Sequence, residues 1–133
     1  MQVVAAVFRR ADEVLVCRKK TGLSNAGLWE FPGGKCNPGE SLEAALSREV
    51  AEELHVSIDA DQLSGSSLGY HVHDSGSILF ELHCFVVSRW HGEFALTDHD
   101  KIKWCTVEKL RAVELSEADV PFVDRIEAYL NKT

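Results

Sequence analysis

The 133-residue sequence has fewer basic than acidic side chains, 14 against 21, and its formal net charge is −7. A broad electrostatic contact with DNA or RNA requires clustered Lys and Arg, which this balance does not favour. No run approaches the roughly 18 apolar residues of a membrane-spanning helix, and the first residues do not have the pattern of a secretion signal. We therefore expect a cytoplasmic protein that binds neither a nucleic acid polymer nor a membrane.

Cysteine is also sparse, and no C-x-x-C pair is present that would indicate a zinc site or dithiol chemistry. Most of the cysteines lie inside apolar runs, far apart in the sequence. We predict that they are reduced and packed, as in a reducing compartment. They are Cys17, Cys36, Cys84 and Cys105.

The length is that of one domain, and we expect a single domain over residues 1–133. Area scaling predicts a folded surface of roughly 7,000 Å² against roughly 21,000 Å² for the unfolded chain. About two thirds of the surface can therefore leave water, and the core needs no disulfides.

Short β-branched and apolar runs, separated by Gly, Pro and Asp, predict a mainly antiparallel sheet. Helices are predicted over residues 41–54 and 116–130, the second with Pro121 in its first turns. The predicted fold class is α/β, an α/β/α sandwich around a mixed, largely antiparallel sheet. The predicted strands are residues 2–8, 13–17, 28–31, 67–73, 78–87 and 101–107.

The helix over residues 41–54 has the clearest pattern, with Ser41 as its N-cap and apolar residues every three or four positions. Glu49, Glu52 and Glu53 share one face of it, because they lie at i, i+3 and i+4. Like charges at these spacings repel, and they also crowd the negative end of the helix dipole. Three oxygen donors on one face are what a hard divalent cation such as Mg²⁺ requires. The alternative is a solvated acidic face neutralised by nearby Lys or Arg.

The segment from Gly34 to Val56 resembles the Nudix box, whose pattern is G-x5-E-x7-R-E-U-x-E-E-x-G-U with U aliphatic. The flanking residues 28–35, Trp104 and residues 118–121 are similar to the MutT-like branch of that family, and most to its small pyrimidine-triphosphate pyrophosphohydrolases. The matching positions of the box are Gly34, Glu40, Arg48, Glu49, Val50, Glu52, Glu53 and Val56.

His55 departs from the box, which usually has Gly at this position. That Gly would adopt a left-handed conformation at the end of the helix, which His can enter at moderate cost. We expect either a left-handed His55 or a helix that is tilted or extended by a turn.

The resemblance implies a Nudix-type fold and hydrolysis of a nucleoside diphosphate linked to another group, with Mg²⁺ or Mn²⁺ on the box. It implies that the metal ligands are Glu49, Glu52, Glu53 and the carbonyl of Gly33. Glu52 is also a candidate for orienting or deprotonating the attacking water. An acidic protein can bind a polyanionic triphosphate only through such cations, which also polarise the water.

By the same resemblance, Glu40 and Arg48 support the box; Arg48 either reaches back to Glu40 or braces Glu52. The alternative is an ordinary surface ion pair. Asp98, six residues before Trp104, is a candidate catalytic base, with nearby Asp100 as the alternative.

For substrate contacts, the resemblance indicates Lys19, or the adjacent Arg18, and Lys35 for the phosphates. Glu30 and Phe31 are expected to line the nucleotide cleft and Trp29 to lie in the core, because neighbours on a strand alternate faces. The alternative for these lysines is simple surface exposure.

Asp119 aligns with the residue that reads the base edge in relatives. A carboxylate accepts hydrogen bonds and suits the N4 amine of cytosine or the N7 proton of 8-oxoguanine. The alternative is a helix N-terminal acid stabilised by the dipole.

These residues predict an enzyme, a monomer or weak homodimer, that cleaves a nucleoside triphosphate such as CTP, dCTP or 8-oxo-dGTP to the monophosphate and pyrophosphate. Two alternatives are a hydrolase acting on a nucleotide sugar or dinucleoside polyphosphate, and a nucleotide-sensing module without turnover.

Overall fold

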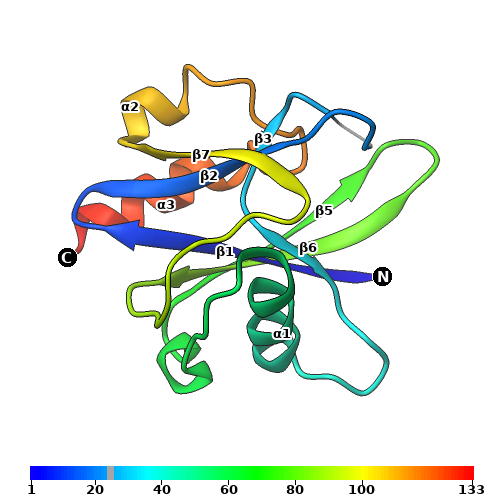
Figure 1. Ribbon diagram of the computed structural model, residues 1–133, viewed down its shortest axis with the longest axis horizontal. Coiled ribbons are helices and arrows are strands. Elements are labelled where there is room, and N and C mark those ends of the chain that lie inside the picture. Colours follow the sequence, from blue (N-terminus) through cyan, green and yellow to red (C-terminus); the bar gives the residue numbers. More distant parts are fainter. Residues whose placement is uncertain (24–25) are drawn as a thin grey trace.

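The computed structural model describes residues 1–23 and 26–133 and shows helices on both sides of a central sheet (Figure 1). The strands are β1 Gln2–Arg10, β2 Glu13–Lys19, β3 Trp29–Glu30, β4 Gly33–Lys35, β5 Ser67–Asp74, β6 Leu79–Val87 and β7 His99–Cys105. The helices are α1 Leu42–Leu54, the 3₁₀ helix η1 Ala60–Leu63, α2 Val107–Leu110 and α3 Phe122–Asn131.

Strand β1 is the centre of the sheet. It pairs in parallel with β6 along most of its length, and antiparallel with β4 and with the end of β2 next to their shared turn. The pairs β5–β6, β2–β3 and β2–β7 are all antiparallel. The sheet is therefore mixed and largely antiparallel, as predicted from the sequence.

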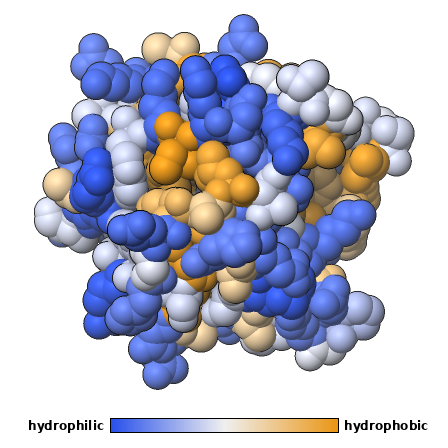
Figure 2. All heavy atoms as spheres, viewed as in Figure 1, coloured by the Kyte–Doolittle hydropathy of each residue, from blue (hydrophilic) through white to orange (hydrophobic). Residues whose placement is uncertain are grey.

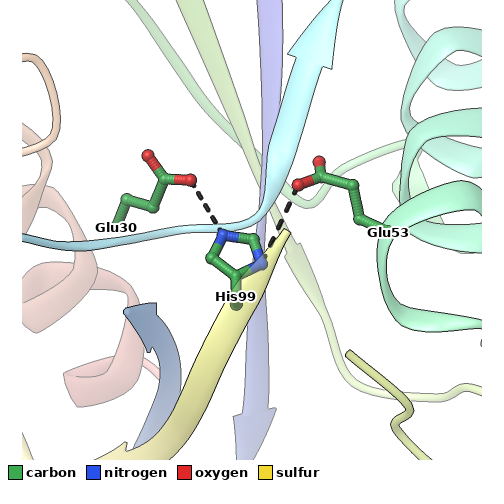
Figure 3. Close-up of side chains that lie close together, drawn as sticks. All are labelled: Glu30, Glu53 and His99. Carbon is green, nitrogen blue, oxygen red and sulfur yellow. Dashed lines mark hydrogen bonds and ion pairs between the residues drawn. The ribbon is translucent and has the colours of Figure 1, made fainter. Parts of the chain in front are cut away.

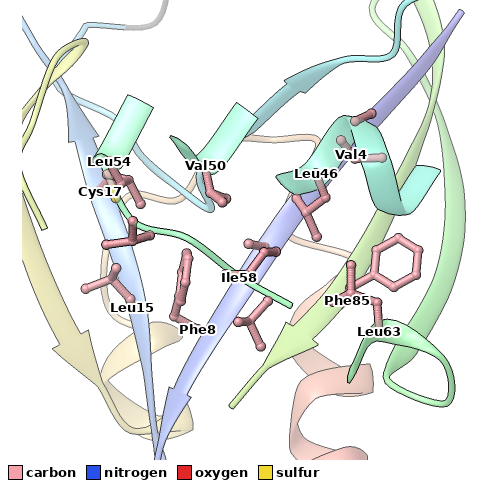
Figure 4. Packing of buried hydrophobic residues seen from close by; sticks show 14 residues of the cluster. Val4, Phe8, Leu15, Cys17, Leu46, Val50, Leu54, Ile58, Leu63 and Phe85 are labelled. Carbon is pink, nitrogen blue, oxygen red and sulfur yellow. The ribbon is translucent and has the colours of Figure 1, made fainter. Parts of the chain in front are cut away.

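Alternation along β1 supplies two hydrophobic cores, one on each face of the sheet. Val4, Ala6 and Phe8 belong to the core beneath α1, shown in Figure 4, while Ala5 and Val7 belong to the core beneath α3. Because successive side chains of a strand point to opposite faces, one apolar strand serves both layers. The predicted α/β/α arrangement is confirmed, with α1 and α3 on opposite sides of β1 (Figure 1).

The accessible surface of 7080 Å² matches the value expected from the length. All the cysteines are free thiols, three of them buried and Cys36 half-buried, so the prediction of packed thiols is confirmed. Figure 2 shows a largely hydrophilic face with hydrophobic surface in limited patches. Among the described residues, no helix is long and apolar enough to cross a membrane.

Helix α1 is capped at both ends by the residues that the sequence singled out. The Ser41 hydroxyl accepts a hydrogen bond of 3.1 Å from the amide of Ala44. At the other end His55 is left-handed, with φ 60° and ψ 29°, and its amide donates to the carbonyl of Ala51. The helix is therefore not extended, and His55 adopts the conformation for which the family usually has Gly.

The start of the last helix was predicted wrongly. Helix α3 begins at Phe122 rather than at Ser116, and Pro121 precedes it with φ −60°. The residues before it form turns, in which the amide of Asp119 donates to the carbonyl of Ser116. These turns direct the Asp119 side chain inward, where its carboxylate accepts a hydrogen bond from the amide of Phe31.

The double glycine after Pro32 was predicted to be loop, but it forms the short strand β4. Gly33 pairs with Ala5 of β1, and a Cβ at Gly33 would lie 1.9 Å from the carbonyl oxygen of Val4. No side chain fits at that distance, so glycine is required for β4 to approach β1. This pairing places the double glycine beside the C-terminal half of α1.

Candidate active site

The acidic face of α1 lies against the double glycine of β4. A Cβ at Gly34 would lie 2.3 Å from a carboxylate oxygen of Glu49, and the amide of Gly33 donates to Glu53 Oε1 at 3.1 Å. The absence of side chains on Gly33 and Gly34 therefore lets two box carboxylates approach the backbone. The structure brings Gly33, Glu49 and Glu53 together, as the sequence predicted.

Arg48 joins several acidic groups at the outer edge of this face. Its guanidinium donates to both oxygens of Glu40, at 2.8 and 3.0 Å, and to Glu49 at 2.9 Å. It also donates to the carbonyl of Lys35 at 3.0 Å, and Glu52 lies at 3.4 Å. These bonds hold the pKa of the Glu40 carboxyl at about 2, and Arg48 ties α1 to the loop before it.

Glu52 differs from its neighbours on the box. Its side chain is 59% exposed, whereas that of Glu49 is 15% and that of Glu53 8% exposed. Besides its 3.4 Å contact with Arg48, the described residues give its carboxylate no hydrogen bond or ion pair. Glu52 is thus a carboxylate at the rim of the acidic face.

Glu53 is the buried carboxylate of the box. Burial, and then repulsion from Glu30 and Glu49, raise its pKa to about 8, although Lys19 and the amide of Gly33 act in the opposite direction. A carboxylate in this environment is stabilised by any cation that binds beside it. Glu53 is therefore a candidate ligand for a cation rather than a solvated surface charge.

A histidine lies between Glu53 and a second carboxylate, Glu30 on β3 (Figure 3). His99 Nε2 is 2.9 Å from Glu30 Oε2, and its Nδ1 is 3.9 Å from Glu53 Oε2. The Lys19 ammonium is 3.7 Å from the same Glu30 oxygen. Three elements, β3, β7 and α1, thus contribute to one buried cluster.

A cleft of about 200 Å³ opens beside this cluster. Its lining includes Lys19, Glu30, Phe31, the double glycine and Asp119. The sequence predicted that Glu30 and Phe31 line a common cleft, and the structure places both there. The cleft therefore brings the double glycine, against which Glu49 and Glu53 lie, together with the buried carboxyl group of Asp119.

Asp119 is 5% exposed, and its Oδ2 accepts a hydrogen bond of 3.0 Å from the amide of Phe31. Burial raises the pKa of Asp119 to about 8, and repulsion from Glu30 makes a smaller contribution in the same direction. Below that pH the side chain is a neutral acid, which both donates and accepts hydrogen bonds. Asp119 therefore offers two kinds of contact to a ligand in the cleft.

Two other hollows help to define the site. One of about 320 Å³ shares Phe80, Ser116 and Ala118 with the cleft and extends it toward the β5–β6 turn. A larger one of about 680 Å³ lies between Leu28 and helices α2 and α3. The lining of this larger hollow contains none of the box residues, so the smaller cleft is the candidate active site.

Several predicted residues lie outside the cleft lining. Lys35 is exposed, and its carbonyl rather than its ammonium contacts Arg48. Asp98 is half-buried, and its carbonyl accepts a hydrogen bond from the amide of Lys20. Asp100 and Arg18, the two alternative residues, form an ion pair of 2.7 Å with each other, and neither lines the cleft.

Trp29 is half-buried and packs against the core beneath α3, and the Lys103 ammonium lies 5.3 Å from the centre of one of its rings. His99 was not singled out from the sequence. Its only signal there is its place next to Asp98, directly before an alternating strand. The carboxylates that surround it come from residues 46 and 69 positions away, which no local pattern reveals.

Comparisons with known proteins agree with this geometry. A family model of the NUDIX domain matches residues 1–126. The CTP pyrophosphohydrolase of Escherichia coli is 32% identical over 124 residues, 93% of this chain and 89% of that protein. The putative 8-oxo-dGTP diphosphatase 2 of Mycobacterium tuberculosis is 35% identical over 129 residues, 97% and 89% of the two chains.

Among solved structures, the solution structure of the E. coli ORF135 protein superposes with a TM-score of 0.83 and 32% identity, covering 96% of this chain and 88% of that one. The fold is the one expected from the Nudix resemblance. The chain therefore belongs to the NUDIX family, as an enzyme of the hydrolase class with MutT-like and pyrophosphohydrolase relatives.

Proposed function

We propose that the protein hydrolyses a nucleoside triphosphate to the nucleoside monophosphate and pyrophosphate, using Mg²⁺ or Mn²⁺ held on the carboxylates of α1. The observation that carries this proposal is a cleft whose lining includes both the double glycine, against which Glu49 and Glu53 lie, and the buried Asp119. Such a cleft matches a ligand with a polyanionic end and a base. The named activities of the relatives support the same reaction.

The residues present fit a divalent metal. Glu49 approaches the bare Cα of Gly34, and the buried Glu53 carries a raised pKa that a nearby cation would lower. Glu49, Glu52, Glu53 and the carbonyl of Gly33 would hold the ion, all of them oxygen donors suited to Mg²⁺. When bound, the metal would neutralise phosphate charge and polarise the attacking water.

The other residues have supporting roles in this proposal. Arg48 positions Glu49 and the loop that leads into α1 through its hydrogen bonds. Glu52 orients the attacking water, because it is exposed at the rim and loosely held. Asp98 is the second candidate for orienting or deprotonating this water. Lys19 contacts a phosphate from the cleft lining, and Lys35 does so from the exposed rim.

Asp119 reads the base edge in this proposal. In its neutral form it can accept from the N4 amine of cytosine and donate to the adjacent ring nitrogen, whereas the ionised form only accepts. This complementarity supports CTP and dCTP, and the N7 proton of 8-oxoguanine is the competing partner. CTP and 8-oxo-dGTP are each named in the activity of a relative.

A substrate panel tests the proposal. Release of pyrophosphate and monophosphate is measured with Mg²⁺ for CTP, dCTP, 5-methyl-dCTP and 8-oxo-dGTP, and then repeated with Asp119→Ala. We expect kcat/KM to fall by roughly 10–100-fold for the preferred base and less for the others, because one base contact is worth about 1–3 kcal/mol. Equal losses for all bases would remove the base-reading role, and no pyrophosphate from any triphosphate would overturn the function.

A further inference from the structure

His99 is fully buried and has one ring nitrogen without a partner. Its side chain is 0% exposed, and Nδ1 has no hydrogen bond among the described residues. A buried polar nitrogen that lacks a partner is costly, and most such groups in proteins are satisfied. This nitrogen faces Glu53 Oε2 at 3.9 Å, too far for a hydrogen bond (Figure 3).

The hydrogen bond on the other side of the ring decides which nitrogen is free to bind a ligand. Glu30 Oε2 lies 2.9 Å from Nε2, and a carboxylate oxygen accepts, so the network assigns the proton to Nε2. The Nδ1 lone pair is then directed toward Glu53. A carboxylate that fixes the tautomer of a histidine in this way is a recurring second shell of metal sites.

We propose that His99 Nδ1 and Glu53 together bind a divalent first-row transition ion, with Glu30 orienting the imidazole. This inference rests on the proposed function, because it deepens the metal site on α1. Two ligands that each lie about 2.0–2.2 Å from a shared ion can be at most roughly 4.3 Å apart. The separation of 3.9 Å between Nδ1 and Oε2 is within that limit.

A nitrogen ligand changes which metal the site prefers. Mg²⁺ takes oxygen donors and keeps much of its hydration, whereas imidazole binds first-row transition ions more readily. The oxygen donors of Glu49, Glu52 and Glu53 alone would suit Mg²⁺. With His99 added, Mn²⁺ should bind more tightly than Mg²⁺ in the absence of nucleotide.

Electron spin-echo spectroscopy of Mn²⁺ bound to the wild-type protein tests the nitrogen ligand directly. We expect modulation from a directly coordinated ¹⁴N nucleus. Bound Mn²⁺ with no such modulation would overturn the proposal. This measurement needs no variant, so it does not depend on how well a substituted protein folds.

The variant His99→Gln removes the proposed nitrogen ligand. The Gln amide can still donate to Glu30 but offers no aromatic nitrogen to an ion beside Glu53. We expect the nitrogen signal to disappear and the Kd for Mn²⁺ to rise by roughly 10–100-fold, while the Kd for Mg²⁺ changes by less than about threefold. Equal losses for both metals would show that His99 only supports the fold of the site.

His83→Gln is the control, because His83 also pairs with a carboxylate, Glu81, at 3.1 Å. It should leave the Mn²⁺ spectrum and both Kd values unchanged. The inference and the proposed function fail in different ways. Turnover with Mn²⁺ bound only through oxygen overturns the histidine ligand alone, whereas the absence of both Mn²⁺ binding and turnover overturns the proposed function as well.

Discussion

The acidic residues around α1 form two regions with the same chemistry and opposite environments. In the outer region, Arg48 binds Glu40 and Glu49, and the pKa of the Glu40 carboxyl falls to about 2. In the inner region, burial and then repulsion from neighbouring carboxylates such as Glu30 raise the pKa values of Glu53 and Asp119 to about 8. The outer charges are neutralised by the protein itself, whereas the inner ones are left for a ligand to neutralise.

This contrast explains why a helix with adjacent like charges is stable. The guanidinium of Arg48 offsets the outer repulsion and ties the helix to Lys35 at the end of β4. Among the residues that the structure describes, Glu53 accepts one hydrogen bond, of 3.1 Å, from the amide of Gly33. We infer that the outer region positions the helix and the inner region carries the chemistry, and substitutions on each side test that division.

The largest effect is expected from Glu53→Gln. It removes an anionic ligand while keeping the size of the side chain, so turnover should fall by roughly a hundredfold or more. The variant should still fold at pH 8, because it also removes a buried charge. Pyrophosphate release and thermal unfolding measure the two properties separately.

Glu43→Gln is the matched control, because Glu43 lies in the first turn of the same helix and is not one of the fixed positions of the box. It should retain turnover. Full activity in Glu53→Gln would show that the inner region is not the site.

A smaller effect on turnover, together with a loss of stability, is expected from Arg48→Ala. Glu40, Glu49 and Glu52 would lose their shared cation, and Tm should fall by roughly 3–6 °C. Arg111→Ala provides the comparison, because its partners Asp124 and Glu127 are both exposed. It should lower Tm less. An equal fall in both variants would contradict a positioning role for the outer region.

The smallest effect is expected on the pH dependence of the stability of the fold. The folded-state pKa of Asp119, about 8, lies above its ordinary value of 3.8, so between these pH values the folded protein holds a proton that the unfolded chain has released. The associated stability is present below about pH 4 and is lost as pH rises to 8. Asp119→Asn should therefore lose less stability between pH 5 and pH 9 than the wild type does.

Urea unfolding across that range measures the difference, and Asp124→Asn is the control because Asp124 is exposed. If the stability of Asp119→Asn falls with pH as steeply as that of the wild type, Asp119 is ionised in the folded protein at neutral pH.

The parts of this molecule that depend on local spacing were predictable from the sequence. The helix with Ser41 and His55 at its ends, and the placement of Glu49 and Glu53 on one face, follow from helical periodicity. Strand β4 was missed, because Gly33 and Gly34 have no strand propensity and are held by pairing with β1.

Other features depended on contacts between distant segments. The start of α3 was misplaced because the turns before Pro121 are stabilised by the inward Asp119, which binds Phe31 far away in the sequence. His99 was missed for the same reason, since its neighbours come from β3 and α1. Spacing predicted which residues carry the box, and tertiary packing determined which of them are buried.

The account depends most on a divalent cation that joins the inner carboxylates to a triphosphate. Calorimetry with a CTP analogue whose α and β phosphorus atoms are bridged by a methylene group tests this directly. We predict that the analogue binds with Mg²⁺ and that Glu53→Gln weakens this joint uptake by tenfold or more. Binding that is equally tight when EDTA has removed every divalent ion would contradict the account.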